Sequence, residues 1–599
     1  MKVLLIQPPV EDFYQTTSRI LPVGLLYLAA SLKRNGIEVE ILDCQATDKK
    51  ETIEMPPEFA YLKSYYRSGN LSPFKLFSHY RHYGLPWEEI RECIRLANAD
   101  VIGISSLFTP FYREAFRVAA IAKELDATRP VIMGGAHVNA CPEQALANPN
   151  VDFVLLGEGE RTLPELLAAF DIGKSIAAIR GVGYKSHDKL HLPEHGDLIE
   201  DIETLPLPAR ELIDPARYIL GGKRLTMLVT SRGCPYHCTF CSIFLTAGRQ
   251  FRKRSIVSII DEMKLCRERF GTEIFDIEDD NFSFDQKRAA QILAAIREEF
   301  GEGQIALLAM NGISAANISE PLVDEMKRTG FRALNLALVT SDKQQQRATK
   351  RPGSTSHFDR VVKKAAEVGL EMVNYVILGL PDSTIEEMLD SIIHLMQRPV
   401  LIGPSVFYAT PGTGSYRQCL ERGLLPSAEL ALQRSTCFPV ETKNFSRRDL
   451  VTLFQLTRFL NFIKSRLDAQ PTRTAAFMLR DLLSSPRLPD FTPQAGEIYT
   501  FSHKLTETEI GSWLARALLD EGRLLGMRLL RRENERVVYQ VYEEEASSRA
   551  IELFLEKTEG KTVYGVKNHF AFTRLIRKIV ELKSAEDSFR QGWKEAMAG

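Results

Sequence analysis

The chain has 599 residues, of which 44% are hydrophobic and 26% are charged, with a formal net charge of −1. This length requires several domains, and the near-neutral charge gives no reason to expect nucleic acid or an acidic surface as a partner. No apolar run approaches membrane-spanning length, and the cysteines form no disulfide framework, so we expect no membrane span and a reducing compartment, the cytoplasm.

The first part of the chain alternates short apolar strands with helical patterns. The predicted strands are Val3–Gln7, Val39–Asp43, Asp100–Ser106, Pro130–Met133 and Val151–Leu156. The predicted helices are Pro22–Asn35 and Arg113–Leu125. Strands that alternate with crossover helices predict a parallel sheet, in which ligands bind beyond the carboxyl ends of the strands.

Several of these strand ends carry small or polar residues suited to a ligand. They are Ser105, Gly134, Gly135, His137, Gly157, Glu158 and Gly159. Glycine lets a backbone approach a flat or phosphate-bearing ligand closely. His137 has two open interpretations, a hydrogen bond to such a ligand or the cap of a loop.

Residues 48–83 interrupt the alternation with a stretch rich in aromatic and basic side chains. Such side chains can stack on nucleic-acid bases, but we favour an insertion that packs its aromatics over the sheet edge or the mouth of the active site. A linker follows at residues 171–220, with a predicted hairpin of Val182–Tyr184 and Leu190–Leu192.

A CxxxCxxC motif, formed by Cys234, Cys238 and Cys241, follows the predicted strand Leu225–Thr230. Three thiolates in one loop suit a [4Fe–4S] cluster that leaves one iron open to an outside ligand. The alternatives are three unrelated thiols or a partial zinc site. Zinc sites usually use four ligands in paired CxxC units, and the sequence has no second pair.

The alternation of strands and helices resumes at Leu225. The predicted strands are Leu225–Thr230, Ile274–Ile277, Ile305–Ala309, Ala333–Leu338, Met372–Ile377 and Val406–Tyr408. The predicted helices are Ser255–Arg269, Lys287–Phe300, Glu320–Thr329, His357–Val368 and Ile385–Met396. Six such units describe a partial barrel, whose functional groups belong at the carboxyl ends of the strands.

The cysteine motif, with Phe240 before its last cysteine, resembles the signature of the radical SAM superfamily. Residues 21–29, 134–137 and 157–160 look like the cobalamin-binding-type domain that precedes the barrel in the B12-binding class of that superfamily. The resemblance implies an α/β fold with a Rossmann-like cobalamin-binding domain (1–170) and a partial (β/α)6 barrel (221–425), on either side of the linker (171–220). It does not extend to residues 426–599. Their pattern predicts a mainly helical C-terminal region, where Arg447–Asp468 is the predicted helix and Val537–Val541 the clearest predicted strand.

The resemblance also implies a site for S-adenosylmethionine (SAM) at the strand ends of the barrel. The candidate residues are Phe240, Asp279, Asp280, Asn311, Thr340 and Gly379. A carboxylate suits the SAM ammonium group, although Asp279 and Asp280 could instead cap a turn. Val339 departs from the pattern, because many relatives have a glutamate there that contacts SAM. SAM would then be held by Asn311, Thr340 and Ser341, or its handling is altered.

For the first domain, the resemblance implies cobalamin contacts from the seven strand-end residues named above. The sequence has no Asp-x-His-x-x-Gly segment to supply a lower axial histidine to cobalt. Three functions stay open: a cobalamin-dependent radical methyltransferase, a radical cyclase or oxidase of the same architecture, and an iron–sulfur electron-transfer protein without SAM chemistry. The first two imply a small-molecule or lipid-like substrate and an electron donor such as flavodoxin or ferredoxin.

Overall fold

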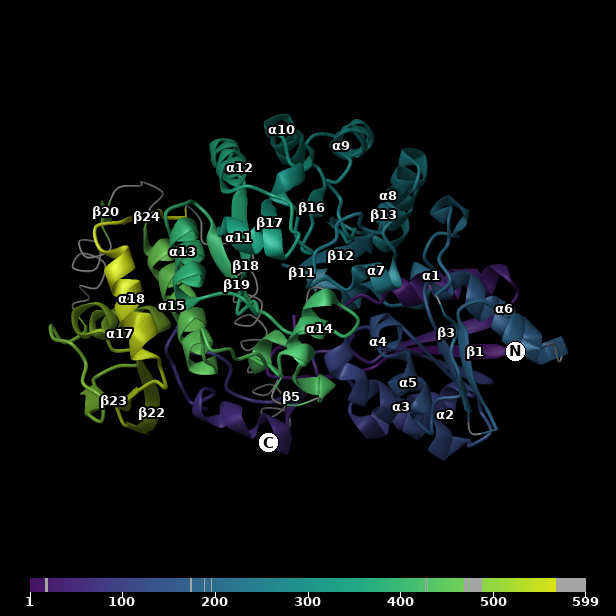
Figure 1. The fold of residues 1–599 in the computed structure, drawn as a ribbon, viewed down its shortest axis with the longest axis horizontal. Helices are drawn as coiled ribbons and strands as arrows, with labels where there is room; N and C mark the ends of the chain where they lie inside the picture. Colours follow the sequence, from purple (N-terminus) through teal and green to yellow (C-terminus); the bar gives the residue numbers. More distant parts are fainter. Residues whose placement is uncertain are drawn as a thin grey trace, which may run out of the picture.

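The computed structural model describes residues 1–16, 20–172, 175–187, 189–194, 196–425, 427, 429–467, 473–474 and 487–566. Three regions follow one another across the molecule (Figure 1): an N-terminal α/β domain, a partial barrel in the centre and a C-terminal region on the far side. Asp468 at the end of one predicted helix lies outside the described residues, as does the end of the chain after residue 566.

The N-terminal domain is built on a seven-stranded sheet with the order β10-β9-β8-β7-β6-β1-β3. The strands are β1 (Lys2–Gln7), β3 (Glu38–Asp43), β6 (Val101–Ser105), β7 (Val131–Gly134), β8 (Phe153–Leu155), β9 (Val182–Ser186) and β10 (Lys189–His191). The first five pair in parallel, as predicted, while β9 joins β8 antiparallel. The hairpin predicted within the linker is present and extends this sheet.

Helices cover both faces of this sheet (Figure 1). The helices of one face are α2 (Trp87–Ala97), α3 (Tyr112–Leu125), α4 (Ala136–Ala140) and α5 (Pro142–Ala147). Those of the other face are α1 (Val23–Arg34) and α6 (Gly159–Ile172). The two apolar cores that result, one on each face, explain why these strands read as continuous apolar runs.

The barrel consists of two parallel sheet segments, β12-β15-β16 and β17-β18-β19, linked by a backbone bridge between Ile313 and Leu336. The strands are β12 (Lys223–Leu228), β15 (Ile274–Ile277), β16 (Ala306–Leu308), β17 (Ala333–Val339), β18 (Glu371–Leu378) and β19 (Leu401–Val406), and β11 (Ile219–Leu220) adds an antiparallel edge. The prediction of the sixth strand at Val406–Tyr408 is wrong, because β19 begins at Leu401 and ends at Val406. Proline is unusual inside a strand, but β19 is an edge strand, where the missing N–H of Pro404 is tolerated.

Each of the barrel helices begins directly after a serine, threonine or aspartate. They are α8 (Ile256–Phe270), α9 (Gln286–Phe300), α10 (Glu320–Thr329), α11 (Lys343–Ala348), α12 (Thr355–Glu367), α13 (Ile385–Met396) and α14 (Gly414–Glu421). Ser255 caps the first of these through its side chain, and Gly271 ends that helix in the left-handed conformation. Thr384 and Glu387 form a capping box at the start of α13.

The described residues of the C-terminal region form three helices and a small antiparallel sheet. The helices are α15 (Arg447–Arg466), α17 (Glu507–Glu521) and α18 (Ser548–Thr558), and the sheet strands are β21 (Ile498–Phe501), β22 (Leu525–Glu533) and β23 (Arg536–Glu543). Its buried side chains share one continuous apolar core with the barrel. Within the described part of the chain, no helix is long and apolar enough to cross a membrane.

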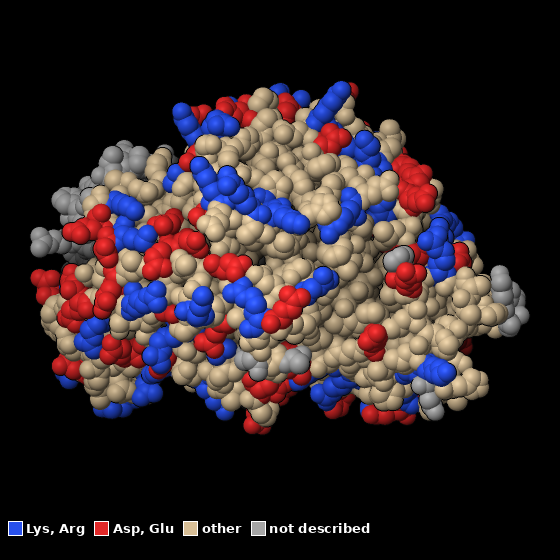
Figure 2. Space-filling view, viewed as in Figure 1, with Lys and Arg blue, Asp and Glu red and all other residues tan. Residues whose placement is uncertain are grey.

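The aromatic insertion bridges the N-terminal domain and the C-terminal region. It contains β4 (Lys50–Thr52) and β5 (Arg81–Tyr83), and β5 lies between β4 and β2 (Val10–Asp12) and pairs antiparallel with both. Phe74 is buried and packs edge-on against Phe459 of α15. The N–H of Leu71 donates to the carbonyl of Met527 at 2.7 Å. Phe74 therefore packs as the sequence favoured, although its partner is the C-terminal region, which the prediction did not name. On the face in Figure 2, positive and negative side chains are interspersed.

Candidate functional site

The cysteine motif lies between two short paired strands, β13 (Ser231–Arg232) and β14 (Arg252–Lys253). Cys234 and Cys238 are buried and Cys241 is half-buried. The pKa of Cys241 is raised to about 11, mainly by burial and to a smaller extent by the charges of Cys238 and Cys234. Bound iron would supply the positive charge that holds the three cysteines as thiolates.

The arrangement of these cysteines suits a multi-iron cluster better than a single metal ion. In the described part of the chain, no three or more His, Cys, Asp or Glu side chains are arranged to hold one metal ion. A [4Fe–4S] cluster distributes its cysteines over separate irons, so its ligands stand farther apart than those of mononuclear zinc. The donor set, three cysteines in one loop, fits the cluster.

Neighbouring segments hold the cysteine loop in place. The N–H of Thr239 donates to the carbonyl of Thr349 at 3.0 Å, and its carbonyl accepts from the N–H of Ser415 at 2.9 Å. Phe240 is partly buried against the barrel core. Thr413 caps α14, so the first turn of this helix, which contains Ser415, contacts the loop.

Two side chains donate toward the cysteine sulfurs. Asn281 Nδ2 lies 3.6 Å from Cys234 Sγ, and an Arg351 guanidinium nitrogen lies 3.8 Å from Cys238 Sγ. Hydrogen bonds to ligand sulfurs influence the reduction potential of an iron–sulfur cluster. Arg351 was missed from the sequence, because it lies in the polar segment between α11 and α12, which carries no motif.

The two acidic residues after β15 have different surroundings. Asp279 is 3% exposed, and its carboxylate accepts from the Thr230 N–H and from the Ser231 hydroxyl, each at 2.6 Å. These contacts match the turn-capping alternative. Asp280 accepts from the N–H of Gly233 at 2.7 Å, directly before Cys234. Burial raises the pKa of Asp280 to about 6.

The fourth strand ends in an unusual turn at Val339. This residue has a φ of 70° and is buried, and the N–H of Thr340 donates to the carbonyl of Leu338 at 2.9 Å. A hydrogen bond between residues i and i+2 around a left-handed centre is a strained γ-turn, rare for a β-branched residue. The Thr340 hydroxyl is engaged by Ser391 of α13 at 3.3 Å and by the Asp342 N–H at 3.1 Å.

The remaining SAM candidates differ in accessibility. Asn311 is exposed in the turn after β16. Gly379 has a φ of 83°, and a Cβ placed there would lie 2.9 Å from the side chain of Leu450 in α15. Gly379 is therefore required by packing against the C-terminal region. Roles for both residues in SAM binding stay predictions.

The strand ends of the N-terminal domain provide polar atoms for a cofactor. His137 is fully buried and stacks on Tyr112 with ring centroids 5.5 Å apart. Among the described residues, neither His137 ring nitrogen nor the Ser106 hydroxyl has a hydrogen-bond partner. Burial lowers the pKa of His137 to about 4, so the ring is neutral. Such atoms fit a ligand rich in amides, as the corrin of cobalamin is. Ser105 ends β6 beside Gly134 of β7.

Two of the glycines at these strand ends, Gly135 and Gly157, are required by close backbone contacts within the protein. A Cβ on Gly135 would lie 2.6 Å from the Ser106 carbonyl oxygen, and one on Gly157 only 2.0 Å from that of Asp197. Gly134 has no atom nearer than 3.8 Å to such a Cβ, which leaves room beside it. Gly159 packs against Leu28. The carboxylate of Glu158 forms ion pairs with Arg232 and Arg252.

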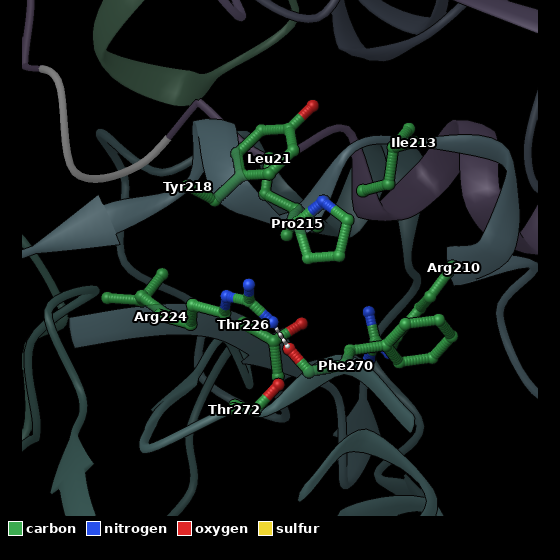
Figure 3. Close-up of a pocket in the computed structure, with 10 residues that line it drawn as sticks. Leu21, Arg210, Ile213, Pro215, Tyr218, Arg224, Thr226, Phe270 and Thr272 are labelled. Carbon is green, nitrogen blue, oxygen red and sulfur yellow. Dashed lines mark hydrogen bonds between the residues drawn. The ribbon is translucent and has the colours of Figure 1, made fainter. Parts of the chain in front are cut away.

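The pocket in Figure 3 lies at the other end of β12 from the cysteine loop. Arg224, Leu225 and Thr226 of that strand contribute to its wall, and Arg224 donates to the carbonyl of Phe270 at 2.8 Å. Amino-terminal strand ends in barrels serve stability, while the carboxyl ends carry function. This pocket is therefore not part of the candidate site.

Two family models match the chain, a B12 binding domain over residues 77–167 and the radical SAM superfamily over residues 228–394. An uncharacterized methyltransferase of Pyrococcus horikoshii is 28% identical over 65% of this chain and 76% of its own length. Cytidylyl-2-hydroxyethylphosphonate methyltransferase of Streptomyces wedmorensis is 27% identical over 73% of this chain and 84% of its own.

Solved structures share the fold. The radical SAM methyltransferase TsrM of Kitasatospora setae, with cobalamin and a [4Fe–4S] cluster bound, has a TM-score of 0.54 at 17% identity, over 70% of this chain and 78% of its own. The cobalamin-dependent SAM radical enzyme OxsB has a TM-score of 0.55 at 14% identity, over 81% of this chain and 69% of its own. The chain therefore carries a B12-binding domain followed by a radical SAM domain, and the CxxxCxxC loop lies within the second of these.

Proposed function

We propose that this protein is a cobalamin-dependent radical SAM methyltransferase that acts on an unactivated carbon of a small-molecule or lipid-like substrate. The observation that carries the proposal is the contact between α4 and α7 (Ile243–Thr246). The first contains His137 of the B12-binding domain, and the second begins two residues after Cys241 (Figure 1). This contact supports a short distance between the candidate cobalamin site and the cysteine loop. Methyl transfer that involves both cobalamin and SAM requires such a distance.

When bound, the cluster with SAM supplies a carbon radical that abstracts hydrogen, and cobalamin supplies the methyl group. The chain's own residues bind and orient. We assign cluster ligation to Cys234, Cys238 and Cys241. We assign the SAM ammonium to Asp280 and the SAM carboxylate to Arg351, whose guanidinium already lies beside Cys238. Ser106 and His137 would hydrogen-bond the corrin through atoms that the described residues leave unsatisfied.

The partner predictions belong to this proposal. The cluster needs a low-potential electron, for which we propose flavodoxin or ferredoxin as donor. The second candidate function, radical cyclisation, is supported by relatives that are anaerobic magnesium-protoporphyrin IX monomethyl ester cyclases. The one from Rubrivivax gelatinosus is 24% identical over 56% of this chain and 60% of its own length. The two functions differ in whether the product gains a methyl group.

The test is anaerobic reconstitution with iron, sulfide and hydroxocobalamin, then dithionite and SAM. Mass spectrometry would detect 5′-deoxyadenosine, and the corrin retained after desalting would be quantified. The proposal expects deoxyadenosine together with about one corrin per chain. With methyl-deuterated SAM, the label should appear in a product. Deoxyadenosine without retained corrin would favour cyclisation, and an intact cluster that yields neither would favour electron transfer.

A further inference from the structure

Four charged side chains are buried between the N-terminal domain and the cysteine loop. Glu158 and Glu160 follow β8 and begin α6, and each is 7% exposed. Arg232 lies in β13 and Arg252 in β14, with side chains that are 14% and 4% exposed. We call these four residues the arginine–glutamate cluster.

The ion pairs of this cluster are multiple and short. Arg252 binds both carboxylate oxygens of Glu158, at 2.5 and 3.0 Å. Arg232 spans both acids, at 3.1 Å from a Glu158 oxygen and 2.7 Å from a Glu160 oxygen. Two-point contacts of this kind fix orientation as well as distance.

Further contacts limit each partner to one position. Glu158 also accepts from the N–H of Ile199 at 2.7 Å, and Arg252 donates to the carbonyl of Ala247 at 2.6 Å. The Arg232 guanidinium lies over the ring of Tyr27, 4.9 Å from its centroid. Burial alone would lower the pKa of Arg232, but Glu160 and Glu158 raise it above its ordinary value. The arginine therefore stays charged in the interior.

The two arginines stand at the two ends of the cysteine loop. They are cross-strand partners in the β13–β14 pair, and all three cysteines lie in the segment between them. Arg232 is two residues before Cys234, whose neighbour Gly233 donates to Asp280. The B12-binding domain thus holds the loop at both of its ends, without contributing a ligand.

We propose that the arginine–glutamate cluster is a positioning device that sets the distance and orientation of the cysteine loop relative to the cobalamin site. Glu158 is then a positioning residue and not a corrin contact. The inference rests on the proposed function only in that the cysteine loop binds the iron–sulfur cluster and the N-terminal domain binds cobalamin. Because the ion pairs are not ligands, weakening them should leave both groups bound but change their separation.

The test compares Glu158→Gln and Glu160→Gln with Glu165→Gln, an exposed residue of the same helix α6. In the cofactor-free protein, hydrogen–deuterium exchange of residues 231–241 should accelerate about 10-fold or more in the first two variants and stay unchanged in the third. In the loaded protein, electron paramagnetic resonance would measure the spin–spin interaction between cob(II)alamin and the reduced cluster. It should change while iron and corrin contents stay near one cluster and one corrin per chain.

Unchanged exchange and an unchanged spin–spin interaction in Glu158→Gln would overturn the proposal. So would a loss of both groups together with a lower melting temperature, because that pattern marks a purely structural role. If the glutamine variants do not fold, Arg232→Lys keeps the charge but loses the two-point contact, and the same changes are expected of it. Should the wild-type chain bind no corrin, the proposed function fails, while the exchange experiment still tests the hold on the loop.

Discussion

The carboxylate of Asp279 accepts a hydrogen bond from the backbone N–H of Thr230 at 2.6 Å, which joins the carboxyl ends of β15 and β12. This contact orients the peptide from which the cysteine loop departs. The next residue, Asp280, points to the loop itself through Gly233. We therefore expect different tasks for the two adjacent carboxylates, one within the protein and one in binding SAM.

The variants Asp279→Asn and Asp280→Asn should separate these tasks. The amide at position 279 would oppose the donors of Thr230 and Ser231, so we expect a loss of about 1–3 kcal/mol in the free energy of unfolding. Asp280→Asn should weaken SAM binding about 10-fold, through loss of a charged acceptor, and leave the iron content intact. Denaturant titration and equilibrium SAM binding are the measurements. Unaltered SAM affinity in Asp280→Asn would remove that residue from the site.

Replacing Cys238 by alanine should abolish the absorbance near ~400 nm of the reconstituted protein, because thiolate-to-iron charge transfer produces it. Iron and sulfide contents should fall in parallel. Cys93→Ala is the matched control, since Cys93 is a half-buried cysteine of α2 outside the motif. An unchanged spectrum in Cys238→Ala would refute the ligand assignment.

Arg351→Ala should weaken SAM binding by about 10-fold or more, because a carboxylate loses its charged partner. Arg351→Lys should recover only part of the affinity, since a point charge cannot replace a planar fork. Arg347, an exposed residue of α11, provides the control Arg347→Ala. Equal SAM affinity in all of these variants, measured on samples of equal iron content, would exclude the assignment.

His137→Phe should keep the stack on Tyr112 but remove both ring nitrogens. We expect about 10-fold weaker binding of hydroxocobalamin, the order of one or two lost hydrogen bonds. Thermal stability should stay the same or rise, because the unsatisfied buried nitrogens are replaced by carbon. Spectroscopic titration of the corrin is the measurement, and wild-type affinity would restrict His137 to packing.

Glu544 should make stability depend on pH. Burial raises its pKa from 4.5 to about 7, against the lowering effects of Arg67 and of the hydrogen bond from Asn70. The folded state therefore favours the neutral carboxyl. The contribution of Glu544 to the free energy of unfolding is complete below about pH 4.5 and is lost as the pH rises through about 7. Glu544→Gln should remove on the order of 3 kcal/mol of that dependence. The free energy of unfolding would be measured at pH 5 and pH 8. If it changes equally between these pH values in the wild type and in Glu544→Gln, the carboxyl is not buried.

The sequence alone determined most of the repeating architecture. Helix α10 and helix α13 were predicted with their observed ends, because a serine or threonine cap and helical periodicity mark them. Strand β15 was likewise predicted at Ile274–Ile277. The cysteine spacing identified the superfamily, since three ligands within eight residues need no long-range information.

Tertiary structure decided which polar residues at the strand ends are engaged within the protein. Sequence position placed Asp279, Thr340 and Glu158 at ligand-binding edges, yet their partners come from strands and helices far away in the chain: Thr230, Ser391 and Arg252. Arg351 approaches Cys238 across 113 residues of sequence. Local patterns fix periodicity and caps, whereas the partner of a buried charge depends on how distant elements pack, which no local pattern encodes.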